Sequence, residues 1–296
     1  MKKIAFVTLL AITSYFGVQS QISYGGTPPS FIYQNQLRAS EQIDIVETSN
    51  INTQKLLEED LLDQRNGKPQ AIAVVIPTDI DIERTGTWLD LPNDTRIWKQ
   101  TIMVPEANGI ILEYDDFYIP EGGQLFIYNK DRSQLLGAYT EKTNPEGGKY
   151  SNEIVYGDEL TLEYVESKVS DEHPRIVVTE VGYIYLRSEE LRDVVNPPQS
   201  PTVGDAASCM INVACEEGDN WRKQIRSVVR LVARIGTKWY RSTGSFINNV
   251  NNDGAPYLLT ADHCFYSGGT LGEFSTAHFY FNFQHPTCSN STVVPA

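Results

Sequence analysis

Two short segments decide the fold of the C-terminal part of this chain: STGSFINN at residues 242–249 and YLLTADHC at residues 257–264. Each has the length of a strand, and turn-forming residues at 251–254 separate them, so we expect two adjacent strands. The second strand delivers His263 into a corner of small residues. A strand end can hold a general base in one orientation at the edge of a cleft, and the neighbouring Cys264 could anchor that corner.

Strand signals continue on both sides of these two segments. Short runs rich in Val, Ile, Tyr and Phe predict strands at residues 228–234, 238–249, 257–260 and 278–284. A Ser-Gly-Gly turn at residues 267–269 lies between the last two.

The preceding part of the chain shows the same pattern. It predicts strands at residues 71–76, 86–91, 95–104, 109–117, 124–129, 135–140, 159–165 and 176–186. Turns containing proline and glycine separate them, including those at residues 120–123 and 144–148. Short, evenly spaced strands of this kind favour an antiparallel β-sandwich, so the predicted fold class is all-β.

The N-terminus has the pattern of a secretory signal peptide at residues 1–20. Lys2 and Lys3 supply its positive charge, residues 4–16 form its apolar core, and small residues follow at the cleavage site. This core is too short to span a membrane, and no later stretch is apolar over the required length. We expect a secreted or periplasmic protein without a membrane span.

Composition divides the remaining chain into four parts. Residues 21–70 are polar and carry one helical pattern at residues 53–64, which indicates a leader or docking segment. We assign residues 71–190 to the β-sandwich domain. Three closely spaced prolines mark residues 191–203 as a semi-rigid linker, and residues 204–296 form the second segment.

Charge is distributed unevenly between these parts. Residues 21–203 hold 31 acidic and 15 basic residues, whereas residues 204–296 hold seven of each. A nucleic-acid-binding protein needs a basic surface, which neither part has the composition to provide. We therefore expect no nucleic-acid partner.

The second segment holds all four cysteines, Cys209, Cys215, Cys264 and Cys288. An exported chain meets an oxidising environment, so disulfides are the expected state. Zinc binding is the alternative, but there is no Cys-x-x-Cys pair, and the adjacent His263 and Cys264 are poorly spaced for joint ligation. His278 and His285 are interpreted as surface or strand-face residues. We predict no metal and no cofactor.

The two segments quoted first resemble the histidine region of trypsin-like (chymotrypsin-fold) serine proteases, where a Thr-Gly-Ser strand precedes Leu-Thr-Ala-x-His-Cys. Residues 204–218, with their two cysteines, are similar to the mature N-terminus of bacterial lysyl endopeptidases, and the strand at 278–283 before Cys288 also fits that family. This resemblance covers nearly all of residues 204–296. It implies the first β-barrel of the protease fold, here incomplete.

The first domain resembles the precursor region of the same family at residues 86–88, 96–98 and 119–123. The resemblance implies a pro-domain that assists folding or keeps the protease latent.

The resemblance implies that His263 is the catalytic base, which takes a proton from a serine hydroxyl and returns it to the leaving amine. A buried aspartate and oxyanion-binding amides would assist it, in the chain order His, Asp, Ser. No aspartate follows Asp262, Glu273 is the only later acid, and no later serine lies in a Gly-x-Ser-Gly context. We therefore expect residues 1–296 to be a truncated, inactive form.

For the cysteines, the resemblance implies a disulfide between Cys215 and Cys288 and a partner for Cys209 beyond residue 296. Cys264 would pair with a cysteine at the position that Ser242 holds here, so the sequence departs from the family pattern. The partners of Cys209 and Cys264 stay open, a bond between these two included.

These features predict the precursor of a secreted serine endopeptidase that needs no cofactor, with a lysine preference implied by the resemblance. Its expected partners are a polypeptide substrate and its own pro-domain. The alternative is a non-catalytic secreted β-sandwich protein for binding or adhesion, carrying a degenerate protease remnant. Ser242 and the missing triad residues favour that alternative.

Overall fold

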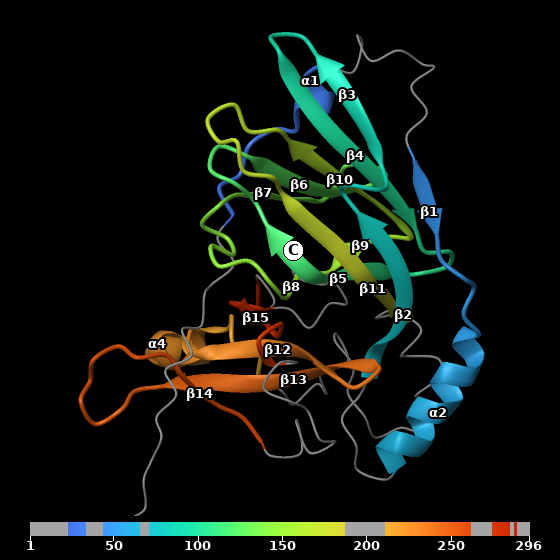
Figure 1. Ribbon diagram of the computed structural model, residues 1–296. Helices are drawn as coiled ribbons and strands as arrows, with labels where there is room; N and C mark the ends of the chain where they lie inside the picture. The colour runs from blue at the N-terminus through green and yellow to red at the C-terminus, as the bar shows by residue number, and fades with distance from the viewer. Residues whose placement is uncertain are drawn as a thin grey trace, which may run out of the picture.

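The structure of the protein is a computed structural model that describes residues 23–33, 44–65, 71–186, 211–261, 274–284 and 287–288. Within these ranges the chain forms two curled sheets with a few short helices, and the predicted all-β class is confirmed (Figure 1). The predicted signal peptide at residues 1–20 and the linker at residues 191–203 lie outside the described residues.

The first sheet belongs wholly to the N-terminal part of the chain. Its spatial order is β1 (Ile45–Glu47), β4 (Thr95–Met103), β10 (Glu159–Val165), β6 (Gln124–Asn129) and β7 (Leu135–Tyr139), and β3 (Thr87–Leu91) also pairs with β4. These pairs are antiparallel except that of β1 with β4.

The second sheet joins the two parts of the chain. Its spatial order is β15 (His278–Phe281), β12 (Val228–Ile235), β13 (Lys238–Ile247), β2 (Ala71–Asp81), β11 (Arg175–Ile184), β5 (Gly109–Tyr118) and β8 (Tyr150–Ser151); β14 (Tyr257–Leu259) pairs with β13, and β9 (Val155–Tyr156) pairs with β5. Figure 1 shows β2 descending from the first domain to the end of β13. The second segment therefore does not form a separate unit joined only by the linker, because strands of both parts belong to one sheet.

The main core lies between the two sheets of the N-terminal domain. Alternate residues of the strands point inward and bury large side chains, among them Trp98, Phe117, Tyr164 and Tyr183. Phe117 stacks on Tyr150 with ring centroids 4.4 Å apart. These aromatic groups pack among a larger number of buried Ile, Leu and Val side chains, and burial of both kinds stabilises the sandwich.

The leader segment packs onto this sandwich at α1 (Pro29–Ile32). The Ser30 backbone N–H donates to Glu163 Oε1 at 2.9 Å, and its hydroxyl donates to Glu163 Oε2 at 2.5 Å. Tyr128 also donates to Oε2 at 2.9 Å, and Lys99 Nζ lies 3.9 Å from it. Burial lowers the pKa of Lys99, although Glu163 opposes this. A buried carboxylate thus fixes the leader to the sheet.

The helix predicted at residues 53–64 is present as α2 (Thr53–Arg65). Its Leu56 and Leu57 pack against the main core, and its Asp60 is buried. The acidic run after Cys215 forms a short 3-10 helix, η1 (Glu216–Trp221), followed by α4 (Arg222–Ile225).

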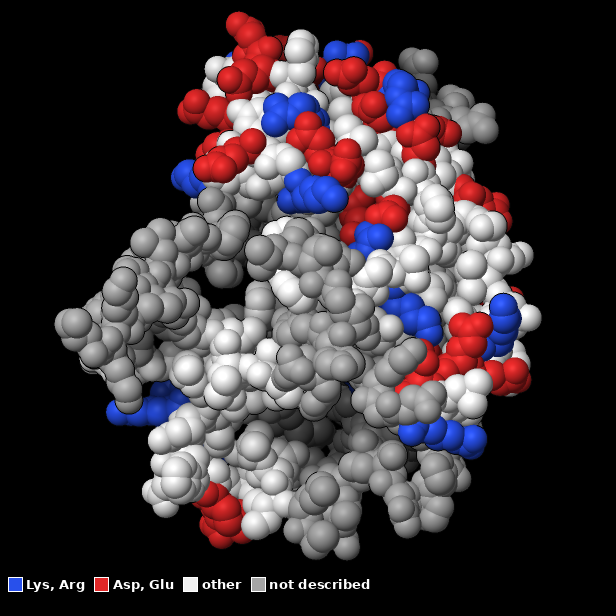
Figure 2. Space-filling view, turned by 60° about the horizontal axis from the view of Figure 1, so that its bottom comes forward, with Lys and Arg blue, Asp and Glu red and all other residues white. Residues whose placement is uncertain are grey.

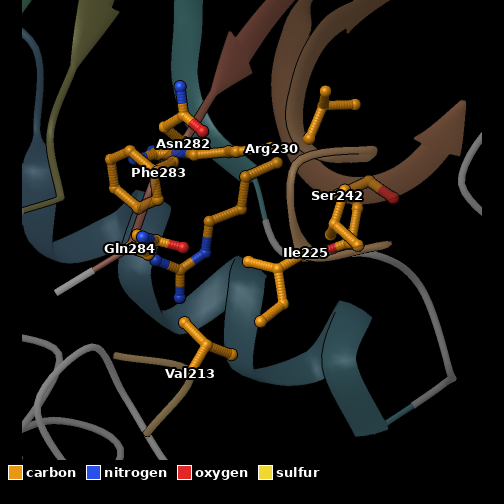
Figure 3. A pocket seen from close by; sticks show the side chains of 11 residues that line it. Val213, Ile225, Arg230, Ser242, Asn282, Phe283 and Gln284 are labelled. Atoms are coloured by element: carbon orange, nitrogen blue, oxygen red, sulfur yellow. The ribbon is translucent and has the colours of Figure 1, made fainter. Parts of the chain in front are cut away.

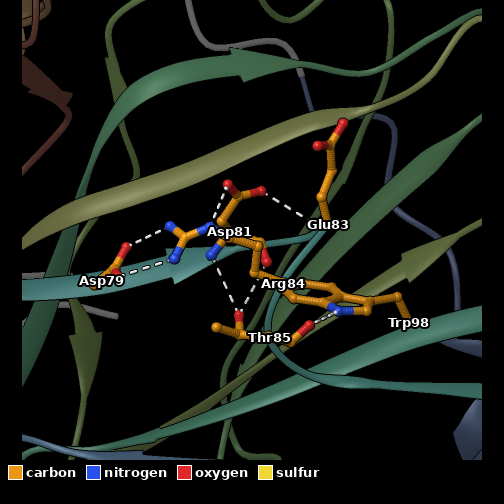
Figure 4. Close-up of polar contacts among 6 residues, drawn as sticks. All are labelled: Asp79, Asp81, Glu83, Arg84, Thr85 and Trp98. Carbon is orange, nitrogen blue, oxygen red and sulfur yellow. Dashed lines mark hydrogen bonds and ion pairs between the residues drawn. The ribbon is translucent and has the colours of Figure 1, made fainter.

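The turn between β2 and β3 explains two of the sequence motifs in the first domain. Trp98 Nε1 donates to the Thr85 carbonyl at 2.7 Å, and Gly86 lies against the same indole with φ at 79°. A Cβ at Gly86 would lie 2.3 Å from Trp98 Nε1, so only glycine fits. Figure 4 shows Arg84 between Asp79 and Asp81, with N–O distances of 2.6 and 3.1 Å. These ion pairs lie on the solvent-facing side of the turn and connect Arg84 to two residues of β2.

Candidate active site

The strand pair quoted at the outset forms one edge of the second segment. Ser245 lies opposite Leu259, Phe246 opposite Leu258 and Ile247 opposite Tyr257, so β13 and β14 run antiparallel. The described chain continues from β14 to Ala261. His263 and Cys264 lie outside the described residues, so the structure does not place the predicted catalytic base.

Two contacts set the approach to the predicted histidine corner. The hydroxyl of Thr260 donates to the Thr243 carbonyl at 2.8 Å, which joins the end of β14 to β13. A Cβ at the buried Gly244 would lie 2.8 Å from Leu258 Cδ1, so a larger residue would require the Leu258 side chain to move. The Thr-Gly-Ser and Leu-Leu-Thr stretches therefore form a single packing unit.

The corner is also tied to the rest of its sheet. The Phe246 N–H donates to the Ser227 carbonyl at 2.8 Å, and its ring stacks on Phe281 with centroids 5.4 Å apart. Ser245 pairs in register with both Val228 and Leu259. Ser245 therefore lies inside the sheet, with a strand partner on each side.

A pocket of about 440 Å³ opens beside this region (Figure 3). Its lining comprises Val213, Ile225, Val228, Val229, Arg230, Arg241, Ser242, Thr243, Asn282, Phe283 and Gln284. Figure 3 shows Asn282, Phe283 and Gln284 on one side and Ser242 on the other. The Arg230 guanidinium lies 4.5 Å from the centre of the Phe283 ring.

Both arginines of this pocket are partly withdrawn from water. Burial lowers the pKa of Arg241, and the nearby positive charge of Arg230 lowers it further. Arginine, serine and amide side chains together offer mainly hydrogen-bond donors, so the pocket suits an acceptor-rich group such as a carboxylate or peptide carbonyl. No sequence motif indicates this pocket, because its two arginines are brought together only by the pairing of β12 with β13.

A disulfide joins Cys215 to Cys288, with the two Cα atoms 4.5 Å apart. This is the pairing implied by the resemblance, and it links the start of η1 to the chain after β15. Cys209 and Cys264 lie outside the described residues.

In the described ranges no group of three or more His, Cys, Asp or Glu side chains is placed to hold a metal ion. No helix among the described residues is both long and apolar enough to cross a membrane. In the upper and right-hand parts of the surface in Figure 2, acidic and basic residues are interspersed.

His278 differs from a surface histidine. Its side chain is buried, and its Nε2 lies 2.7 Å from the Ser151 hydroxyl of the first domain. The imidazole also stacks on Trp239 with ring centroids 5.3 Å apart. It occupies a strand face, as one of the two sequence interpretations holds, but that face is covered by the other domain.

Comparison with known families gives one finding. Residues 203–295 match the family model described as lysyl endopeptidase, C-terminal domain. The match covers about a third of the chain and includes the whole β12–β15 region. This part of the protein is therefore related to the lysyl endopeptidases.

Proposed function

We propose that this chain is the precursor of a secreted serine endopeptidase whose protease domain begins within residues 204–296. The observation that carries the proposal is the match of residues 203–295 to the lysyl endopeptidase domain, which spans the predicted histidine corner. A preference for peptide bonds after lysine follows from the same relationship. Residues 21–190 would then be the pro-domain.

In this proposal His263 is the general base. It accepts the serine proton as the hydroxyl oxygen attacks the peptide carbonyl, and it then protonates the departing amine. The packing of Gly244 on Leu258 and the hydrogen bond from Thr260 to Thr243 hold the chain as far as Thr260, three residues before His263. Such fixation matters because a misplaced base loses its hydrogen bond to the nucleophile.

The proposal requires an aspartate and a serine that residues 264–296 do not supply. The only acid in that stretch is Glu273, and none of its serines lies in a Gly-x-Ser-Gly context. Catalysis is therefore proposed for a product that extends past Ala296, and residues 1–296 by themselves are expected to be inactive.

The test compares residues 1–296 with the product encoded by the same gene read past Ala296. Both are assayed on fluorogenic peptides that end in lysine, arginine or alanine, and with a fluorophosphonate probe that labels activated serines. We expect lysyl cleavage and labelling only for the longer product. Replacing His263→Ala should lower kcat/KM by about 10³-fold or more, since loss of a triad member removes most of the catalysis.

His173→Ala is the matched control, because His173 is exposed on the first domain. Its activity should equal that of the unaltered product. Lysyl cleavage that survives His263→Ala would contradict the assigned base.

One observation favours the non-catalytic alternative, namely Ser242 at the position where the resemblance has a cysteine. A stop codon directly after Ala296, or a longer product without peptidase activity and serine labelling, would support a secreted binding protein instead.

A further inference from the structure

The two parts of the chain meet at a contact that we call the junction, formed by β2, Glu113, Glu180 and Asp60 on one side and β12, β13 and β15 on the other. The backbone hydrogen bonds of the junction are those that pair β2 with β13. Lys238 lies opposite Val74 and Trp239 opposite Ala73, and the Val75 N–H donates to the Thr237 carbonyl at 2.9 Å. Edge strands left unpaired recruit other strands, and here β2 occupies the edge of β13.

The apolar centre of the junction is Trp239, which is fully buried. It packs in a cluster with Ile72, Ala73, Ile111, Ile154 and Ile184 of the first domain and with Val232 of its own segment. A Cβ at Gly182 would lie 3.3 Å from Trp239 Nε1, so the glycine lets the indole approach closely. A buried tryptophan in a pocket of the partner is typical of the residues that dominate binding.

The ion pairs of the junction all have the same polarity. Arg234 Nη1 lies 2.6 Å from Glu113 Oε2, and Arg234 Nη2 lies 3.1 Å from Glu180 Oε1. Lys238 Nζ lies 3.0 Å from Asp60 Oδ1. Each cation belongs to the second segment and each anion to the chain before residue 187, with Asp60 on α2 and both glutamates on strands of the first domain. This polarity matches the acidic composition of residues 21–203.

Four of these five charged side chains are well withdrawn from water, whereas that of Glu180 is 34% exposed. The side chains of Arg234 and Lys238 are 17% and 16% exposed, and those of Glu113 and Asp60 are 10% and 7% exposed. Trp239 Nε1 donates to the remaining oxygen of Glu113 at 3.0 Å. Complementary charges that are buried and fully hydrogen-bonded give an interface its specificity.

From these contacts we infer that the first domain is a strand-donating partner of the second segment and stays bound to it after the chain is cut between residues 187 and 210. The junction combines strand addition, a buried aromatic anchor and charge complementarity, and none of these needs the covalent link. The inference deepens the proposed function, since it makes the pro-domain a partner that persists after processing. Its test reads binding alone, so it does not depend on peptidase activity.

The experiment uses the full chain with a recognition sequence for a site-specific endoprotease inserted beside Pro198. After cleavage, size-exclusion chromatography in about 150 mM salt, where long-range surface charges are screened, should return both pieces in one peak. Hydrogen exchange should show the Val75 amide still protected, because its acceptor Thr237 belongs to the other piece. Separate peaks, or loss of that protection on cutting, would overturn the inference.

Charge reversal tests which contacts hold the pieces together. In the cut protein, Glu113→Lys with Glu180→Lys should weaken binding by about a hundredfold or more, because both carboxylate partners of Arg234 become cations. Adding Arg234→Glu should restore part of it. Glu159→Lys is the matched control, since it breaks the pair with Lys130, whose side chain is 67% exposed and lies away from the junction.

Equal binding by the charge-reversed protein and the control would contradict the assigned role of the ion pairs. A reversed variant that fails to fold is identified before cutting by the loss of amide protection throughout β6 and β10. The exchange measurement on the unaltered cut protein then decides the inference by itself.

Discussion

Protonation of His278 should loosen the junction at acidic pH. The Ser151 hydroxyl donates to the Thr276 carbonyl at 2.9 Å, so its interaction with His278 Nε2 at 2.7 Å requires the imidazole N–H as donor. The neutral ring therefore carries its proton on Nε2. Its Nδ1 is buried and has no hydrogen-bond partner among the described residues, so a second proton would place an unpaired charge beside Trp239.

The size of this loss of stability follows from the pKa of His278. Burial lowers the pKa of His278 from 6.5 to about 4, and an interaction with the Ser151 backbone opposes this only in part. The unfolded chain then binds more protons than the folded one between these two values. Stability from this group is complete above pH 6.5 and is lost as the pH falls toward 4. A displacement of this size corresponds to about 3 kcal/mol.

The assay is urea denaturation of the full chain at several pH values between 7 and 4, followed by tryptophan fluorescence, with His278→Gln in parallel. Glutamine keeps a donor toward Ser151 but cannot ionise. Burial raises the pKa of Glu113 and Glu153, which acts in the opposite direction, so the informative quantity is the difference between the two proteins. The free energy of unfolding of the unaltered protein minus that of His278→Gln should fall by about 3 kcal/mol between pH 7 and pH 4. A constant difference would refute the buried neutral histidine.

Three further predictions concern single side chains. Replacing Glu163→Gln should lower the free energy of unfolding by about 3–5 kcal/mol in urea denaturation, because the buried lysine beside it loses its partner charge; a loss below about 1 kcal/mol would indicate a solvated pair. Gly86→Ala should cost about 2–4 kcal/mol by thermal unfolding, because the new methyl group meets Trp98 at a left-handed backbone position; an unchanged melting temperature would contradict this. Ser242→Cys should form a disulfide with Cys264, which mass spectrometry of a non-reducing digest detects as a linked pair of peptides. Cys264 recovered unlinked to residue 242 in the oxidised variant would contradict that pairing.

The order and approximate bounds of most strands could be predicted from the sequence. The predicted strands at residues 124–129 and 159–165 have the bounds of β6 and β10. These signals are local, because each strand carries its own alternation and is bounded by its own turn residues. The short β8 and β9 were missed, since two residues are too few to show any periodicity.

The candidate site was predicted only as far as local motifs reach. The Thr-Gly-Ser and Leu-Leu-Thr segments are adjacent strands, as predicted, because they follow each other in the chain with only residues 248–256 between them. The pocket that holds Arg230 and Arg241 was not foreseen. Its arginines lie on neighbouring strands, and their side chains share a face only through the register of that pair.

By itself, the sequence determined that the chain is all-β, that its two parts differ in charge, and that the second part carries a protease-like histidine motif. Only the tertiary structure decided that those two parts share one sheet, with β2 at the edge of β13. Strand alternation shows that a strand has a buried face but not which distant strand lies beside it. The same limit applies to the charges, because Arg234 and Glu113 are 121 residues apart in the chain and meet only once the sheet has formed.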